Sequence, residues 1–482
     1  MREPRAARAT LLVGLLGVGV SLAWSWRPSY WYDEAATLSA ATRDLQDLER
    51  LVRHVDLVHG GYYLIMKPWI ALTGSTEFAT RSFSALGLGV TCAGVVQLGR
   101  RLADLRLGVT AGVASILLPG LAWTGLEARG YSWACASVVL WVLAWLRAEE
   151  SDRARDWVVC TTALVVSVHI FVISILMVPV LLVAARAWGR ARGLLPSSVV
   201  GTVLCLPLLI AAKSQDHALG DTGQTLGMTF AKILGRQYFL SPRGPREAGL
   251  VWVAASVLAL TCALLAGRAI TARRSRETQR VLTLVVPWIV LPNAVLVLWS
   301  WVVRPVYAER YASFTAPALG LLLAYGLVQL DDRRARQLTL GVVAALACVV
   351  VQVSQRAEGS KAADDYRALA RFITDHHPDA VLFGVPSTRG VAVAYPDDFV
   401  GPDLPNVGLT PAESETLWGT VRAPDQLLLS TVVEPGGRLV LLDTSAPVWP
   451  GTRFQRWLAR HGCAVETKKA ATRFTAFLVR CP

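Results

Sequence analysis

The chain has 482 residues, of which 53% are hydrophobic and 17% are charged, and its formal net charge is +13. A water-soluble chain of this length carries more charge, and many apolar runs here are long enough to cross the roughly 30 Å hydrocarbon layer of a bilayer. The composition therefore excludes an ordinary soluble protein and predicts a polytopic α-helical membrane protein. The arginines alternate with apolar runs and form no basic face, which favours a role in membrane orientation over nucleic-acid binding.

The apolar runs predict about eleven transmembrane helices. No small-residue cleavage pattern follows the first run, so we interpret it as an uncleaved helix and not as a signal peptide. The run 156–187 is short for two spans, but a single span would put neighbouring arginine clusters on opposite faces. We therefore predict a hairpin that turns near Ser167–His169. The predicted spans are approximately 10–27, 82–99, 107–126, 131–147, 156–168, 170–187, 193–213, 249–267, 281–303, 311–329 and 338–354.

The segment from Gly60 to Gly74 is predicted to be an amphipathic helix that lies in the membrane interface, within the first outer loop. It contains Lys67 and two tyrosines, and it is short for a membrane span. Aromatic side chains favour the headgroup level, where a helix of this kind lies flat.

Arginine clusters set the predicted orientation, because cytoplasmic loops are enriched in Lys and Arg. With eleven spans, six clusters fall on one side, the N-terminus is cytoplasmic, and the C-terminal residues are extracytoplasmic. We predict a multi-pass protein of the plasma membrane. The clusters are Arg2, Arg5 and Arg8; Arg100, Arg101 and Arg106; Arg147, Arg153 and Arg155; Arg186, Arg190 and Arg192; Arg268, Arg273, Arg274, Arg276 and Arg280; and Arg333, Arg334 and Arg336.

The chain is predicted to divide into a transmembrane domain, residues 1–354, and a small α/β domain outside the membrane, residues 355–482. Helical spacing of apolar residues occurs at 361–377 and 452–462, and DAVLFGV, GRLVLLD and FTAFLVR are typical of short strands. Six cysteines lie in apolar runs, where they serve as small packing residues. Cys463 and Cys481 can pair if this domain is extracytoplasmic, and no Cys/His spacing typical of a metal site is present.

The predicted outer loops hold many ionisable residues, which are costly at membrane depth and are candidates for function. A polyprenyl-phosphate sugar has an apolar tail, a phosphate at the interface and a sugar beyond it. Its transfer requires cations for the leaving phosphate and a carboxylate that accepts the acceptor's proton. Asp33 is positioned for the second role. The loop residues are Asp33, Glu34, Asp56 and His59; Glu127, Arg129 and Tyr131; His169; Asp216, His217, Asp221, Lys232, Arg236 and Arg243; and Arg304, Tyr307, Glu309, Arg310 and Tyr311.

An ordered series of motifs over residues 1–330 resembles the GT-C superfamily of integral-membrane glycosyltransferases. The closest resemblance is to the protein O-mannosyltransferase-like and lipid A aminoarabinose transferase-like group. The series consists of the acidic pair Asp33–Glu34, then HGGYYLIMKPWIALTGSTEFATRSFSAL (59–86), EARGYS (127–132), a His at the hairpin (His169), and ERYASFTAPAL (309–319). Gly60 and Gly61 replace the Pro pair of the family, and the C-terminal residues carry no such resemblance.

The resemblance implies a polyprenyl-phosphate sugar donor, transfer on the outer face with inversion, and Asp33 as the catalytic carboxylate. We assign donor-phosphate binding to His59, Arg129, Arg310 and Arg304. Glu34 is either a second catalytic residue or only a charge at a helix start, and Asp33 itself is alternatively a helix N-cap. For Arg129 the alternative is an ion pair with Glu127, and for Arg304 and Arg310 it is contact with lipid headgroups. Glu127, Tyr131, His169 and Tyr62 complete the candidate site.

The sequence requires no cofactor, although a divalent cation, Mg²⁺ or Mn²⁺, is compatible with Asp56 and His59 as ligands. The acceptor is a lipid, a glycan or a protein, and mannose and arabinose donors both fit by family analogy. Two functions of another class stay open. One is a transporter or flippase of a lipid-linked sugar, which we disfavour because neither internal repeats nor buried charge series occur. The other is a non-catalytic scaffold for the cell envelope.

Overall fold

A computed structural model describes residues 2–215, 225–240, 249–271, 275–303, 307–330, 334–361, 364–423, 426–428, 432, 434–444 and 453–482. The chain forms two compact units. The helical unit comprises Met1–Ser25, Leu57–Ile65 and Phe78–Arg356. The mixed unit comprises Trp26–Asp56, Met66–Glu77 and Ala357–Pro482. Two segments of the predicted first outer loop therefore belong to the same unit as the C-terminal residues.

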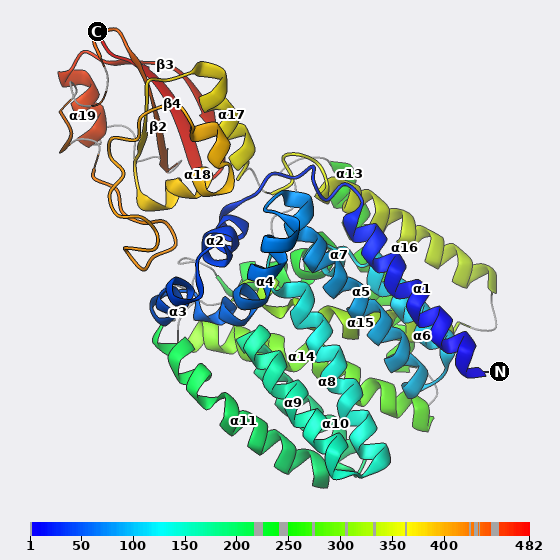
Figure 1. Ribbon diagram of the computed structural model, residues 1–482. Coiled ribbons are helices and arrows are strands. Elements are labelled where there is room, and N and C mark those ends of the chain that lie inside the picture. Colours follow the sequence, from blue (N-terminus) through cyan, green and yellow to red (C-terminus); the bar gives the residue numbers. More distant parts are fainter. Residues whose placement is uncertain are drawn as a thin grey trace. The chain divides into compact units, whose positions relative to one another are not determined.

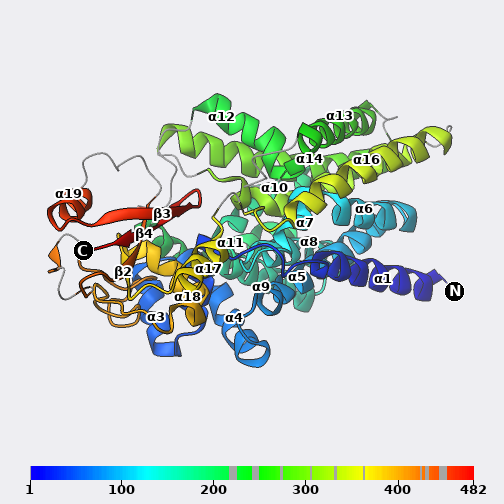
Figure 2. The ribbon, with the colours of Figure 1, turned by 90° about the horizontal axis from the view of Figure 1, so that it is seen from above.

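The helical unit is built from helices that pack in pairs, such as α8 with α9, α6 with α15, and α13 with α16 (Figures 1 and 2). α4 (Gly60–Thr73) passes from this unit into the mixed unit, and α5 (Glu77–Leu102) begins at their boundary. The other helices are α1 (Arg2–Leu22), η1 (Leu57–His59), α6 (Leu105–Leu117), α7 (Pro119–Thr124), α8 (Tyr131–Ser151), α9 (Ala154–Ile170), η2 (Val172–Leu176), α10 (Met177–Ala187), α11 (Ala191–Ser214), α12 (Leu226–Ala231), η4 (Lys232–Leu240), α13 (Gly249–Thr271), α14 (Arg276–Val302), η5 (Glu309–Thr315), α15 (Ala316–Val328) and α16 (Arg334–Gln355).

Among the described residues, eight helices are long and apolar enough to cross a membrane. They are α1, α5, α8, α11, α13, α14, the continuous segment η5–α15, and α16. The remaining three predicted spans correspond to shorter helices, namely α6, α9 and the segment η2–α10. The protein is thus a mostly helical membrane protein.

Two local features explain the shorter helices. α6 ends where Leu118 adopts extended backbone angles, because the residue before a proline is disfavoured in helical conformation. The predicted span 107–126 is therefore two helices, α6 and α7. The run 156–187 is divided in two, as predicted, but the turn predicted near Ser167–His169 lies later. Ser167 and His169 belong to α9, and the break falls at Phe171, whose backbone is extended.

The mixed unit contains a four-stranded sheet with strand order β1-β2-β4-β3. β1 pairs with β2 in parallel, and the other two pairings are antiparallel. One face of the sheet packs its Leu439, Leu441 and Val479 against Trp457 and Leu458 of α19. α17 packs against β3 and β4, where Tyr366 contacts Phe474 (Figure 1). The elements are α2 (Tyr32–Ala41), α3 (Leu45–His54), α17 (Tyr366–His376), β1 (Ala380–Phe383), η6 (Pro386–Arg389), α18 (Gly390–Ala394), η7 (Pro396–Phe399), β2 (Arg438–Thr444), α19 (Arg453–Arg460), β3 (Ala464–Ala470) and β4 (Phe474–Arg480).

The C-terminal elements predicted from the sequence are largely present. The three predicted strands correspond to β1, β2 and β4, and the two helices correspond to α17 and α19. α17 begins later than predicted, at Tyr366, because the side chain of Asp365 accepts a hydrogen bond from the Ala368 N–H and caps the helix there. Cys463 and Cys481 form a disulfide bond, and the other six cysteines are buried.

Candidate active site

Asp33 and Glu34 both lie in the first turn of α2, where Trp31 is the N-cap. Neither is itself the N-cap, and both carboxylates are in the position at which a helix dipole stabilises negative charge. Almost the whole of α2 is buried, because its remaining residues are small or apolar and pack against α18, which is also built of small residues. Asp33 is 9% exposed and Glu34 is fully buried.

Glu34 forms a buried ion pair with Lys361, whose Nζ lies 3.8 Å from Glu34 Oε2. Lys361 lies between α16 and α17 and is 4% exposed. A charge this far from water persists only with a partner of opposite sign. The sequence singled out Glu34 but gave no sign of Lys361, which stands alone among small residues in a segment without family resemblance.

Tyr32, the residue before Asp33, is held from two sides by C-terminal residues. Its hydroxyl accepts a hydrogen bond of 3.1 Å from Trp418 Nε1, and the Arg473 guanidinium lies 4.2 Å from its ring centre. The backbone N–H of Arg473 donates a 3.2 Å hydrogen bond to the buried carboxylate of Asp364. Aromatic and charged groups of the C-terminal residues therefore surround the first turn of α2.

The hydroxyl of Tyr366 is influenced by the charges of both Asp364 and Asp33. Burial raises the pKa of the Tyr366 hydroxyl well above its usual value, and the negative charges of Asp364 and Asp33 act in the same direction. The tyrosine therefore stays protonated beside the carboxylates.

The opposite end of α2 is anchored by backbone carbonyls of the C-terminal residues. Ser39 Oγ donates a 2.5 Å hydrogen bond to the carbonyl of Leu417. Arg43 Nη2 donates a 2.5 Å hydrogen bond to the carbonyl of Thr416. α2 is thus fixed at both ends within the mixed unit.

Several other predicted residues meet in the helical unit, around a cluster of aromatic rings. The ring of His59 lies about 6 Å from the rings of Tyr63, Tyr131 and Phe171. Arg129 Nη1 donates a 2.6 Å hydrogen bond to the Tyr63 hydroxyl, and its guanidinium lies over the same ring. His59, Arg129 and Tyr131 are all buried. The structure therefore brings together three predicted residues from η1, from the loop after α7 and from α8.

Tyr62 and Glu127 belong to the same region through Ser84. The Tyr62 hydroxyl lies 3.4 Å from Ser84 Oγ, and Ser84 Oγ donates a 2.5 Å hydrogen bond to the Glu127 carbonyl. The loop 127–130 is thereby held against α4 and α5. Gly61 fits this arrangement because a Cβ there would overlap the backbone oxygen of His169.

The structure shows local contacts for some of the other predicted residues, and several more lie outside the described residues. The His169 side chain is exposed and its Nδ1 bonds to the Val165 carbonyl of its own helix. Arg310 lies on η5, with its guanidinium over the ring of Tyr311. Asp56 ends a segment of the mixed unit and has a positive φ of 60°. Arg304, Asp216, His217, Asp221 and Arg243 lie outside the described residues.

Sequence reasoning missed Tyr63 and Phe171, although both have a visible signal. Tyr63 stands beside Tyr62 in GGYY, and Phe171 lies at the break of the predicted hairpin. Within the described ranges, no group of three His, Cys, Asp or Glu side chains could hold a metal ion.

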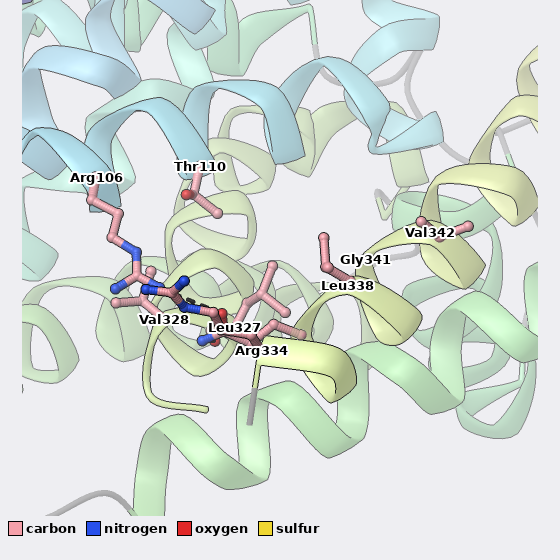
Figure 3. A pocket seen from close by; sticks show the side chains of 9 residues that line it. Arg106, Thr110, Leu327, Val328, Arg334, Leu338, Gly341 and Val342 are labelled. Atoms are coloured by element: carbon pink, nitrogen blue, oxygen red, sulfur yellow. Dashed lines mark hydrogen bonds between the residues drawn. The ribbon is translucent and has the colours of Figure 1, made fainter. Parts of the chain in front are cut away.

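A pocket of about 790 Å³ lies elsewhere in the helical unit, between α6, α15 and α16 (Figure 3). Arg106 and Arg334 line it together with apolar residues such as Leu327 and Leu338. The pocket lies at the start of α6, whereas Arg129 follows α7. It is therefore separate from the aromatic cluster.

Comparison with known proteins identifies the fold. No protein-family model matches the chain, and no curated protein sequence matches it. The solved structure of ArnT from Cupriavidus metallidurans bound to undecaprenyl phosphate is similar, with a TM-score of 0.58 and 14% identity over 97% of each chain. ArnT in the apo state gives a TM-score of 0.57 and 14% identity, over 99% of this chain and 98% of that one. The chain therefore has the same fold as ArnT, the kind of fold that its motifs predicted.

Proposed function

We propose that this protein transfers a monosaccharide from a polyprenyl-phosphate donor to an acceptor on the extracytoplasmic face, with inversion at the anomeric carbon. The observation that carries the proposal is the similarity to ArnT over nearly the whole chain, together with a buried acidic pair in the first loop. ArnT has been solved with undecaprenyl phosphate bound. A phosphate attached to a long apolar chain is a substrate that a helical membrane protein can reach from the bilayer.

In the proposed reaction, Asp33 removes the proton of the acceptor nucleophile while that nucleophile attacks the anomeric carbon. The sugar–phosphate bond breaks on the opposite face, which inverts the anomeric configuration. The leaving group is the polyprenyl phosphate, whose oxygens accept charge-assisted hydrogen bonds from arginine.

Arg129 is the strongest candidate for holding the donor phosphate. Its guanidinium is buried and fixed by the Tyr63 hydroxyl, so its direction is set before the donor arrives. Preorganised cations stabilise developing charge because they need not reorient during the reaction. His59, Arg310 and Arg304 remain proposed partners, with Glu127, Tyr131, Tyr62 and His169 shaping the surroundings.

The proposed topology has eleven membrane spans, with α6, α9 and η2–α10 counted as spans, and with interfacial helices in the first outer loop. It puts the N-terminus in the cytoplasm and residues 355–482 outside the plasma membrane. The Cys463–Cys481 disulfide supports this orientation, because disulfides persist in oxidising compartments.

A liposome assay tests the proposed function. Purified protein is reconstituted with radiolabelled polyprenyl-phosphate mannose or aminoarabinose and with extracts of envelope lipids, glycans and proteins as acceptors. We expect labelled product from one donor, and EDTA followed by Mg²⁺ or Mn²⁺ determines whether a divalent cation is needed.

Asp33→Asn is the decisive variant in this assay. It keeps the size of the side chain and removes the base, so the transfer rate should fall by about 10²–10⁴-fold. Asp47→Asn, on the exposed face of α3, is the matched control and should be as active as wild type. Transfer by Asp33→Asn at the wild-type rate refutes the assigned mechanism, and movement of labelled lipid across the bilayer without sugar transfer indicates a flippase.

A further inference from the structure

The first turn of α2 is held on both sides of Asp33 by residues that follow the last helix of the helical unit. Tyr32 is held by Trp418 and Arg473, and Glu34 is held by Lys361. Successive residues of an α-helix point about 100° apart. Contacts on residues 32 and 34 therefore fix the rotation of the turn about its axis, and with it the direction of Asp33.

The contact at Glu34 differs from the others because it joins two buried charges. Trp418 and Arg473 approach a half-buried tyrosine, which water can also contact. The Glu34 carboxylate and the Lys361 ammonium are both shielded from water. Each charge stabilises the other, since a buried charge without compensation is strongly unfavourable.

The ion pair also gives the two adjacent carboxylates, Asp33 and Glu34, different surroundings, because the Lys361 ammonium pairs with Glu34. Like charges on neighbouring residues favour protonation of one of them. The Lys361 ammonium offsets the negative charge of Glu34, the carboxylate next to Asp33 in the chain. A general base must be ionised before it can accept a proton.

We infer that Lys361 is a positioning residue for the transfer reaction: its buried pair with Glu34 holds the first turn of α2 so that the Asp33 carboxylate faces the acceptor. This inference rests on the proposed function. Glu34 then has a positioning role as well. Lys361, between α16 and α17, is necessary for catalysis although it contacts neither substrate.

The test uses four variants of the full-length protein in liposomes, with saturating acceptor and varied donor. Lys361→Met keeps an unbranched side chain one atom shorter and removes the charge, and Lys361→Arg keeps the charge. Glu34→Gln removes the partner charge, and the double variant Glu34→Gln/Lys361→Met removes both. Lys469→Met, at an exposed position on β3, is the matched control.

We expect kcat to fall at least tenfold in Lys361→Met, with the donor KM within twofold of wild type, and to recover at least partly in Lys361→Arg. The double variant should lose no more than the larger single loss, because the two residues act as one unit. An unchanged kcat in Lys361→Met, or losses that multiply in the double variant, overturns the inference.

Hydrogen–deuterium exchange of the amides of residues 32–41 separates failure of the inference from failure of the proposed function. Exchange can be measured without sugar transfer. It therefore tests whether Lys361 anchors α2 even if the wild-type protein is inactive with every donor. Faster exchange in Lys361→Met than in Lys469→Met, with near wild-type exchange in Lys361→Arg, supports the anchoring of α2. Equal exchange in Lys361→Met and Lys469→Met refutes it.

Discussion

The hydroxyl of Tyr395 makes one of the contacts between the first loop and the C-terminal residues, and its removal should measure how much stability this contact contributes. Tyr395 donates a 2.6 Å hydrogen bond to Glu77 and accepts a 2.9 Å bond from the backbone N–H of Tyr30. Arg367 also pairs with Glu77, through a 2.5 Å contact. Tyr395→Phe removes one oxygen atom and leaves the ring in place.

The magnitude follows from these bonds. A hydrogen bond to a charged group contributes about 1.5–3 kcal/mol, and a buried donor that loses its acceptor costs about 1–3 kcal/mol. Arg367 still compensates the Glu77 carboxylate in the variant, so we expect a total near 3 kcal/mol. In a domain of 150–250 residues, 1 kcal/mol shifts Tm by about 2–4 °C, which gives a decrease of about 6–12 °C.

Thermal unfolding of detergent-purified protein at neutral pH, followed by tryptophan fluorescence, measures this decrease. Tyr30→Phe is the control, because it removes one neutral bond from the Tyr30 hydroxyl to the carbonyl of Ser75, an exposed residue that water can reach. The control should lower Tm by only about 2–4 °C, in line with about 1 kcal/mol. A decrease below 2 °C for Tyr395→Phe, or equal decreases in both variants, contradicts the reasoning.

Three further predictions concern other parts of the chain. Arg129→Met should raise the donor KM at least tenfold in the liposome assay, whereas the control Arg50→Met, on the exposed face of α3, should leave it unchanged. Gly61→Ala should reduce the yield of folded protein measured by size-exclusion chromatography, because its Cβ would meet the His169 backbone; Gly19→Ala, where the space is open, should not. Burial raises the pKa of the Tyr395 hydroxyl above that of an unfolded tyrosine, and the charge of Glu77 acts in the same direction. The contribution of this hydroxyl to the free energy of unfolding is therefore complete below about pH 10. It decreases at higher pH by about 1.4 kcal/mol per pH unit. Tm measured from pH 9 to pH 11.5 should therefore fall less steeply in Tyr395→Phe than in wild type, and parallel curves would contradict the assignment.

The sequence predicts the features that depend on local composition. Each of the eleven apolar runs corresponds to one helix or to a short succession of helices, and Pro119 in the third run explains the one break that was not foreseen. β1, β2 and β4 were visible because each contains a run of at least four consecutive buried residues that are mostly apolar. β3 was missed because every residue in it is exposed, so that AVETKKA has no apolar alternation.

The candidate site was predictable only in part, for a physical reason. Asp33 and Glu34 were conspicuous because carboxylates beside an apolar run are energetically unfavourable at membrane depth. Lys361, the partner of Glu34, and Trp418 and Arg473, the partners of Tyr32, lie more than 300 positions away in the chain. No local pattern indicates which lysine, tryptophan or arginine will meet this turn. Contacts at such separation depend on the folded topology and leave no periodic signal in either segment.

The discontinuous course of the mixed unit has a consequence for synthesis. Its first two segments end at Glu77, and its third begins at Ala357. At about 5–20 residues per second, a ribosome needs roughly 15–60 s to make the intervening residues. During that time α2 has emerged without the C-terminal residues that later bury it, and its small apolar side chains depend on membrane or chaperone for protection. A chain that terminates before Ala357 never completes this unit, so loss of the last quarter of the protein removes the support of its first loop.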